Sequence, residues 1–262
     1  MSEDNIQNES TIKGVFSREK MAKIGTGTTA RRVQQTTYYY VEEVSPGLLE
    51  VQTLSTEMVP YGSKQKVSKE KFLADYMPEP QIYQQQVYPK IRDIQKSIAR
   101  GDKFRARGET FTAEFEYGKA LTIDENNVRA NFGIGLCYME RGDKEKADQV
   151  FSRLVELEAA FDEEHKHLFN SFGINMRKTE MYDQAIAFYK RALKLSGHDE
   201  NIYYNLARCF FDKQDFDMAK KCLVRCLKIN PKHTEAHKFV MYLKKKLTKT
   251  NGTKSTPDTP TE

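Results

Sequence analysis

Two consecutive segments of equal length carry the main fold signal, residues 166–199 (KHLFNSFGINMRKTEMYDQAIAFYKRALKLSGHD) and residues 200–233 (ENIYYNLARCFFDKQDFDMAKKCLVRCLKINPKH). When the second segment is aligned under the first, large apolar residues match large apolar residues and small residues match small ones. The matched pairs are Phe169–Tyr203, Phe172–Leu206, Gly173–Ala207, Met176–Phe210, Ala185–Ala219, Tyr189–Leu223, Ala192–Cys226 and Gly197–Pro231. Every pair has the same 34-residue separation, which predicts one structural unit used twice.

Within each unit the apolar residues stand three and four apart, the spacing of one face of a helix. Small residues stand where two helices have to approach closely. The same register continues upstream into residues 128–161, and more weakly into residues 94–127, where Arg100 occupies an apolar position. We therefore predict four helical hairpins that each bury half a core and stack on the next, the first of them degenerate or capping.

The pattern predicts helices over residues 90–106, 110–122, 128–140, 144–158, 164–178, 182–195, 200–212, 216–228 and 234–247. The last helix, from Thr234 to Leu247, is expected to cap the array. One step departs from the period, because the third unit begins at residue 166, whereas the regular period would place it at residue 162. The four extra residues around 157–165 amount to about one helical turn, so a protruding ridge is expected there.

These repeats resemble the tetratricopeptide repeat (TPR) family over residues 94–247. The resemblance implies a mainly α solenoid whose first helices line a concave face that meets a protein ligand. By that resemblance the candidate groove residues are Phe132, Leu136, Asn170, Ser171, Ile174, Asn201, Tyr204, Asn205 and Arg208. The alternative for Phe132 and Leu136 above all is that they pack between adjacent units.

Residues 14–80 have a different texture and predict a small β-rich or α+β module. Thr36–Val44 and Leu48–Leu54 are rich in β-branched and apolar residues around a Ser-Pro-Gly turn. A third strand is expected at residues 58–61 or 64–67, then a short helix over residues 69–76. Residues 1–13 and 248–262 are predicted to be disordered, and residues 81–93 to be a linker in which Pro89 interrupts any continuous helix.

Composition limits the possible classes of protein. The formal net charge is +5 and no apolar run approaches the ~20 residues of a membrane-spanning helix. Residues 1–13 lack the apolar centre of a secretion signal, so we expect a cytoplasmic protein with no membrane insertion. Nucleic acid is not expected as a partner, since this modest net charge does not by itself indicate one, and nucleic-acid binding usually needs charge concentrated on one face.

No residue set predicts catalysis, a metal or a cofactor. The four cysteines, Cys137, Cys209, Cys222 and Cys226, all fall within the repeats and are expected to be buried free thiols. His165 and His167 are two residues apart, so on a helix they point in different directions. Residues 24–32 (IGTGTTARR) are glycine-rich but lack the lysine of a P-loop, and a loop is expected there.

The function predicted from the sequence is therefore a non-catalytic adaptor or scaffold that holds a peptide or helix of another protein. One TPR subfamily grips acidic chaperone tails with a lysine-, asparagine- and arginine-based clamp, but the equivalent positions here lack the cations. Two alternatives stay open: a secretion or assembly chaperone that shields an apolar client segment, and a ligand-sensing regulator that uses residues 14–80. Homo-oligomers also stay open.

Overall fold

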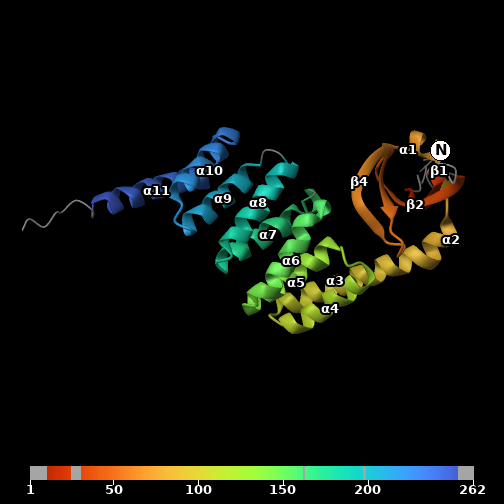
Figure 1. Cartoon of the computed structure of the whole chain (residues 1–262), viewed down its shortest axis with the longest axis horizontal. Coiled ribbons are helices and arrows are strands. Elements are labelled where there is room, and N and C mark those ends of the chain that lie inside the picture. The colour runs from red at the N-terminus through yellow and green to blue at the C-terminus, as the bar shows by residue number, and fades with distance from the viewer. Residues whose placement is uncertain (1–10, 25–30, 162, 197–198, 253–262) are drawn as a thin grey trace, which may run out of the picture.

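The structure is a computed structural model that describes residues 11–24, 31–161, 163–196 and 199–252 (Figure 1). An antiparallel sheet is followed by a chain of helical hairpins. The N-terminal elements are β1 (Lys13–Ile24), β2 (Arg31–Ser45), β3 (Leu48–Leu54), β4 (Pro60–Ser68), α1 (Lys69–Asp75), β5 (Met77–Pro78), α2 (Pro80–Ile82) and η2 (Tyr83–Val87). The solenoid elements are α3 (Tyr88–Ala106), α4 (Thr110–Ile123), α5 (Val128–Arg141), α6 (Lys144–Glu156), η3 (Glu158–Phe161), η4 (Glu163–His165), α7 (Lys166–Lys178), α8 (Tyr182–Ser196), α9 (Glu200–Asp212), α10 (Phe216–Ile229) and α11 (Thr234–Gly252).

The sheet has the strand order β4-β3-β2-β1-β5, and its strand pairings are antiparallel. Its own small core consists of Phe16, Val41, Leu49, Val51 and Phe72. Phe72 comes from α1, which lies on one face of the sheet, and its ring meets the Phe16 ring edge-on at 5.2 Å. The structure thus confirms a small β-rich module with the predicted turn, where Gly47 has a φ of 78°.

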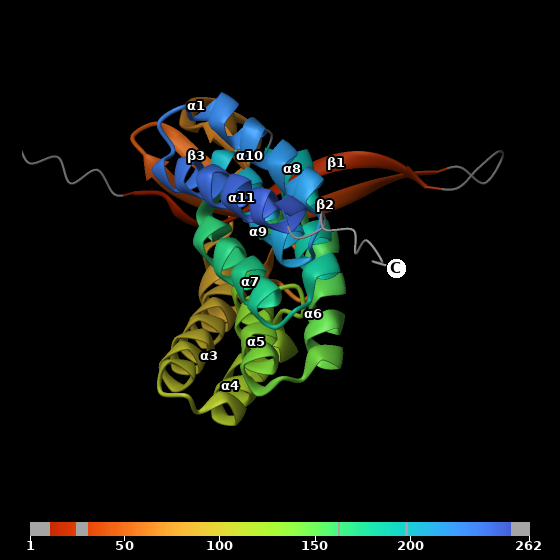
Figure 2. The same ribbon diagram turned by 90° about the vertical axis from the view of Figure 1, so that its left-hand side faces the viewer.

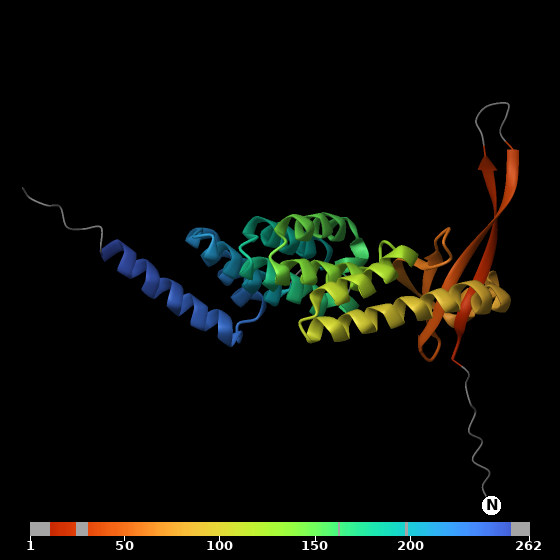
Figure 3. The same ribbon diagram turned by 90° about the horizontal axis from the view of Figure 1, so that it is seen from below.

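β1 is the strand that the sequence analysis missed. It begins at Lys13, inside the segment predicted to be disordered, and pairs with β2 from Lys13–Glu42 to Ile24–Arg31. Charged residues interrupt the apolar alternation of β1, so its pairing with β2, rather than a local pattern, makes it a strand. β5 pairs with β1 only at Phe16 and Ser17, and β3 pairs with β2 only from Tyr39 onward, so the outer part of the β1–β2 hairpin is a two-stranded arm (Figure 3).

The predicted linker is helical, which corrects that expectation. α2, η2 and α3 follow one another without a break from Pro80 to Ala106. Pro89 stands in the first turn of α3, directly after the π-helical turn η2, and the helix continues past it. Val87 is fully buried and the Tyr83 ring lies 6.4 Å from the Tyr40 ring of β2, so this helix packs on the sheet instead of hanging between two parts.

The solenoid confirms the helical pattern. Consecutive helices pack as hairpins, which Figure 2 shows for α3 to α6, and Ala185 and Ala219 are fully buried. Small residues are needed where a neighbouring aromatic ring faces the helix. A Cβ atom placed on Gly173 would lie 2.5 Å from the Tyr189 ring, well inside van der Waals contact.

Replacing Gly173 with alanine is expected to lower the free energy of unfolding by about 1–3 kcal/mol, because the new methyl group overpacks the contact with Tyr189. Gly118 is the matched control, since it lies mid-helix on α4 with nothing within 4 Å of its added Cβ. Gly118→Ala should instead be neutral or stabilise by up to ~1 kcal/mol, since alanine loses less backbone entropy in a helix. Urea denaturation of both variants checks the pair, and equal effects would show that the repeat register is wrong.

The longer step between the second and third units is not an extra turn of helix. The chain there forms two short 3-10 segments, η3 and η4, and η3 lies against β4 of the sheet. Phe161 of η3 packs at 5.3 Å from Phe188 of α8. The additional residues therefore fill the space between the sheet and the third hairpin instead of making a protruding ridge.

α11 extends further than predicted, through Gly252, so residues 248–252 are helical where a disordered tail was expected. Residues 1–10 and 253–262, also predicted to be disordered, lie outside the described residues. Met241 of α11 occupies the register position of Gly173 and Ala207 and is 65% exposed. A large side chain at this position would obstruct the close approach of a further hairpin, so α11 suits the end of the array.

Candidate interaction groove

Seven of the nine residues predicted to line the concave face are at least partly accessible. Asn170, Ser171 and Ile174 of α7 are half-buried, as are Tyr204 and Asn205 of α9. Asn201 and Arg208, also on α9, are exposed. We call these seven residues the α7–α9 groove face.

Phe132 and Leu136 do not belong to that face, which corrects the prediction. They are 0% and 2% exposed. The Phe132 ring lies 5.3 Å from Phe172 of α7 and 6.2 Å from Phe188 of α8. α5 is buried on nearly all sides, so its predicted groove positions pack between adjacent units and are not accessible sockets for a partner.

An aromatic and cationic corner lies at the C-terminal end of the groove face. The Tyr204 ring lies 5.1 Å from the His233 ring and 6.1 Å from the Phe239 ring. The Arg208 guanidinium lies 6.0 Å from the centre of the Tyr204 ring. At this distance the positive charge of the guanidinium is attracted to the face of the ring. Tyrosine and arginine are also the residue types that contribute most to binding energy at protein interfaces.

Asn170 adds an acceptor without a partner. Its side-chain oxygen is buried and makes no hydrogen bond to a described residue. A buried amide oxygen without a donor costs free energy. A peptide N–H that reached this oxygen after a small side-chain rotation would remove that cost, which is a reason to keep Asn170 in the candidate site.

The sheet forms a second hollow with the N-terminal end of the solenoid. A cleft of about 730 Å³ lies between β4 and the helices α3 and α5. Four residues of α3 that line it are Gln95, Ile98, Ala99 and Asp102. In the repeat register these positions correspond to Asn201, Tyr204, Asn205 and Arg208, so the cleft continues the concave face at its first repeat.

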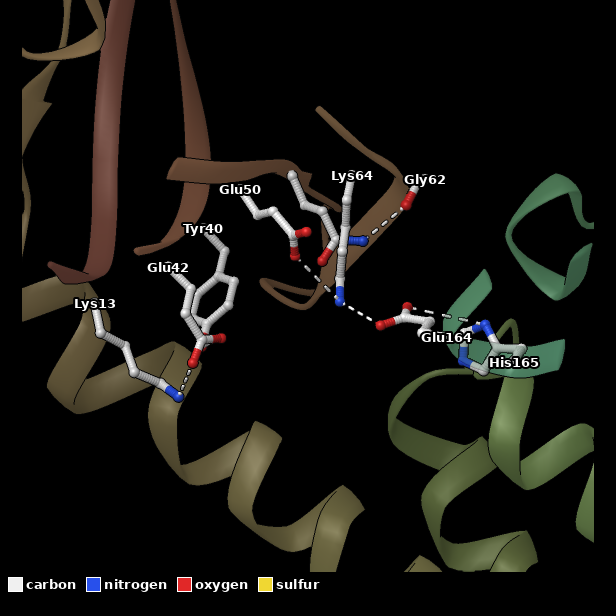
Figure 4. A network of polar contacts seen from close by, with 9 residues as sticks. Lys13, Tyr40, Glu42, Glu50, Gly62, Lys64, Glu164 and His165 are labelled. Atoms are coloured by element: carbon white, nitrogen blue, oxygen red, sulfur yellow. Dashed lines mark hydrogen bonds and ion pairs between the residues drawn. The ribbon is translucent and has the colours of Figure 1, made fainter. Parts of the chain in front are cut away.

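Lys64 spans this cleft (Figure 4). Its ammonium lies 2.6 Å from Glu164 of η4 and 3.7 Å from Glu50 of β3. Burial by itself lowers the pKa of Lys64, but the hydrogen bond and the charge of Glu164 outweigh it, and the pKa is raised overall. The irregular pairing of β4 opposite Gln52, where Gln52 donates to the Gly62 carbonyl, places Lys64 at this point.

The sequence analysis missed this cleft, although two signals pointed to it. The register that selected Asn201 and Arg208 also selects Gln95 and Asp102. The irregular step between the second and third units brought Glu164 within reach of the sheet. What was missing was the packing of the β module against the first repeat.

Comparison with known proteins assigns the helical part. Residues 129–158 and residues 177–240 match the tetratricopeptide repeat family. Within these two segments the chain carries tetratricopeptide repeats. TPR arrays are typically non-catalytic modules for protein–protein interaction, with binding surfaces formed by the stacked repeats. A curated relative, anaphase-promoting complex subunit 3 of Schizosaccharomyces pombe (strain 972 / ATCC 24843), is 24% identical over 152 residues. The match covers 58% of this chain but only 22% of that protein's length.

The chain is also similar to parts of several solved structures. MamA 41-end from Desulfovibrio magneticus RS-1 is 14% identical, with a TM-score of 0.44, over 58% of this chain and 83% of that chain. A crystal structure of MamA is 23% identical, with a TM-score of 0.41, over 60% of this chain and 97% of that chain. YrrB, described as a TPR protein with an unusual peptide-binding site, is 17% identical, with a TM-score of 0.29, over 55% of this chain and 90% of that chain.

The remaining sequence candidates are the cysteines, the histidines and the glycine-rich stretch. The four cysteines are buried and free, and burial raises the pKa of each thiol, to about 11 for Cys137, Cys222 and Cys226 and about 12 for Cys209. Such thiols are poor nucleophiles at neutral pH. Among the described residues no group of histidine, cysteine or carboxylate side chains could hold a metal ion. Of the glycine-rich stretch, residues 25–30 lie outside the described residues.

None of the described helices combines the length and apolarity that crossing a membrane requires.

Proposed function

We propose that the protein is a non-catalytic adaptor that holds a peptide or helix of a partner protein on the α7–α9 groove face. The observation that carries the proposal is that accessible Asn, Tyr and Arg side chains project from two helices, α7 and α9, that are firmly packed in the solenoid. Each of α7 and α9 buries its opposite side in the solenoid core, with Phe172 and Leu206 at 0% and 3% exposure. The helices are therefore held before a partner arrives, and little ordering entropy is lost on binding.

The chemistry of the face suits a polypeptide. Asn201 and Asn205 can each donate to a backbone carbonyl and accept from a backbone N–H. Tyr204 and Ile174 offer apolar contact, and Arg208 can pair with a carboxylate. We also propose a cytoplasmic location, because four buried free thiols suit a reducing compartment.

The alternatives receive less support from the structure. A chaperone for an apolar segment would use a continuous apolar groove, but Phe132 and Leu136 are buried in the core. A ligand-sensing role rested on residues 24–32, most of which lie outside the described residues. The adaptor role is therefore the function that the accessible side chains favour.

Affinity capture from a lysate of the native host tests the proposal. The variant carrying Arg208→Glu and Asn170→Ala should lose its partner protein, because it removes both a cation and an acceptor from the face while leaving the core unchanged. Lys144→Glu, an exposed lysine on α6, is a control for the change of charge. Partner protein is quantified by mass spectrometry, and thermal melting confirms that the variants are folded. Undiminished capture by the double variant would move the site away from this face.

A further inference from the structure

The outer sides of α8 and α10 carry a concentration of positive charge that the groove does not use. Both helices pack on α9. Six of their basic residues are exposed: Lys190, Lys194, Lys220, Lys221, Arg225 and Lys228. None of the six forms an ion pair with a residue in the part of the chain that the structure describes. We call these six residues the outer basic patch.

Cations elsewhere in the array show that ion pairing is available to such repeats. Arg105 pairs with Glu140 at 2.8 Å, and Arg129 pairs with Asp102 at 2.9 Å. These pairs join neighbouring units and neutralise both partners. The six cations of the outer basic patch form no such pairs within the described residues, and Asp217 is the one acid beside them in the lining of the surface hollow. The patch therefore keeps a net positive charge that faces solvent or another molecule.

The repeat architecture does not require cations at these positions. In the repeat register Asp217, Lys220, Lys221, Val224, Arg225 and Lys228 of α10 correspond to Glu145, Asp148, Gln149, Ser152, Arg153 and Glu156 of α6. The α6 positions carry three acids and one base, whereas the α10 positions carry four bases and one acid. The same surface of the same repeat unit therefore changes sign along the array, which points to a local role.

The two helices contribute to one electrostatic environment. Burial raises the pKa of the Cys222 thiol to about 11. The positive charges of Lys190 of α8 and Arg225 of α10 both act to lower it, so both lie close enough to influence the same thiol. Lys190 also lies 5.9 Å from the centre of the Phe210 ring of α9. The charges of the two helices thus converge around α9 and α10.

A hollow of about 970 Å³ lies within the patch. Its walls carry four cations, Lys220, Lys221, Arg225 and Lys228, against one acid, Asp217. Its apolar lining comes from Tyr203, Val224 and Ile229. Val224 is 46% exposed, so an apolar side chain lies open to solvent among the cations of α10. A groove with a partly apolar lining and basic walls fits a chain that carries both carboxylates and apolar side chains.

We propose that this hollow on the outer basic patch binds an acidic segment of a partner protein. Carboxylates of the segment pair with Lys221, Arg225 and Lys228, and an apolar side chain rests on Val224. An acidic protein segment fits better than nucleic acid because the hollow offers an apolar lining and only one partly buried aromatic side chain, Tyr203, for stacking. The hollow is lined by α10 and by Tyr203 of α9, and it shares no residue with the α7–α9 groove face, so the proposal does not depend on that face.

Fluorescence anisotropy with a short labelled peptide rich in glutamate and leucine tests the proposal on the full-length protein. The variant Lys221→Glu, Arg225→Glu, Lys228→Glu should weaken binding by at least about tenfold, since three favourable charge contacts become repulsive. α3 provides a control with the same residue types at the same spacing, Lys96→Glu, Arg100→Glu, Lys103→Glu. These three residues are exposed, and the substitutions change the net charge by the same amount. The control should bind within about twofold of the wild type, because long-range charge effects are screened at physiological salt.

A second variant keeps every cation in place. Val224→Asp puts a carboxylate on the apolar lining and should weaken the peptide several-fold, even if the triple variant does not fold. Equal losses for the α10 and α3 triple variants would overturn the proposal, because they would show a response to net charge alone. Failure of the wild type to bind the peptide would also overturn it, as would displacement of the peptide by single-stranded oligothymidine at equal concentration. The groove variant with Arg208→Glu and Asn170→Ala should bind the peptide normally, so a failure of the groove proposal is seen separately.

Discussion

Replacing Phe188 with alanine is expected to lower the free energy of unfolding by about 3–5 kcal/mol. Phe188 of α8 is fully buried, and its ring lies within reach of rings from four other elements. The rings and their distances from Phe188 are Phe169 at 4.9 Å, Phe161 at 5.3 Å, Phe172 at 5.6 Å, and Phe132 and Phe151 each at 6.2 Å. Removing the ring leaves a cavity between the second and third hairpins, and rigid helices can close it only in part.

Urea denaturation followed by circular dichroism measures the loss. Phe115→Ala is the matched control, because this phenylalanine of α4 is 64% exposed. A surface substitution of this kind should change the free energy of unfolding by no more than about 0.5 kcal/mol. A loss below about 1 kcal/mol for Phe188→Ala would mean that the aromatic cluster does not join the two hairpins.

Replacing Val59 with aspartate is expected to release the β module from the solenoid, at a cost of about 3 kcal/mol. Val59 comes from the β3–β4 loop, is 4% exposed, and belongs to the core of the solenoid instead of the core of the sheet. The loop around it is closed by a hydrogen bond from the Ser55 N–H to the Val59 carbonyl at 2.9 Å. A carboxylate at this buried position loses its hydration among apolar side chains, and no cation was selected there to pair with it.

Limited proteolysis and thermal melting together detect the release. Val59→Asp should increase cleavage between residues 55 and 90 and lower the melting temperature. Val44→Asp, at a valine of the same module that is 47% exposed, should do neither. If Val59→Asp melts and is cleaved like the wild type, the module and the solenoid are not coupled through this loop.

The repeat period predicted the hairpins well because it reports local physics. Helical spacing, a small residue at Gly173 and an alanine at Ala185 follow from what two touching helices need, and the structure confirms them. The β module was predicted in part, since β3 and most of β2 have a strand composition. β1 was not predicted, because its pairing with β2, and not its own pattern, makes it a strand.

The repeat register predicted accessible groove residues correctly on α7 and α9 but not on α5. Tyr204 and Arg208 remain accessible at positions where Phe132 and Leu136 are buried. The register treats these positions as equivalent, but α5 lies between neighbours on both sides and closes over its own groove positions. Phe188 shows the same limit, since its register equivalents are Glu116, Val150 and Cys222, none of them aromatic.

The amino-acid sequence by itself determined the helical hairpins, their order and the small residues at their contacts, because each depends on neighbours within about one repeat. Only the tertiary structure decided which groove positions are open, where the β module packs and where the charges of α8 and α10 converge. Those features depend on contacts between residues far apart in the chain, such as Lys64 with Glu164 and Phe132 with Phe188. A repeat period carries no information about such contacts, because it describes what the units share and not how each one is buried.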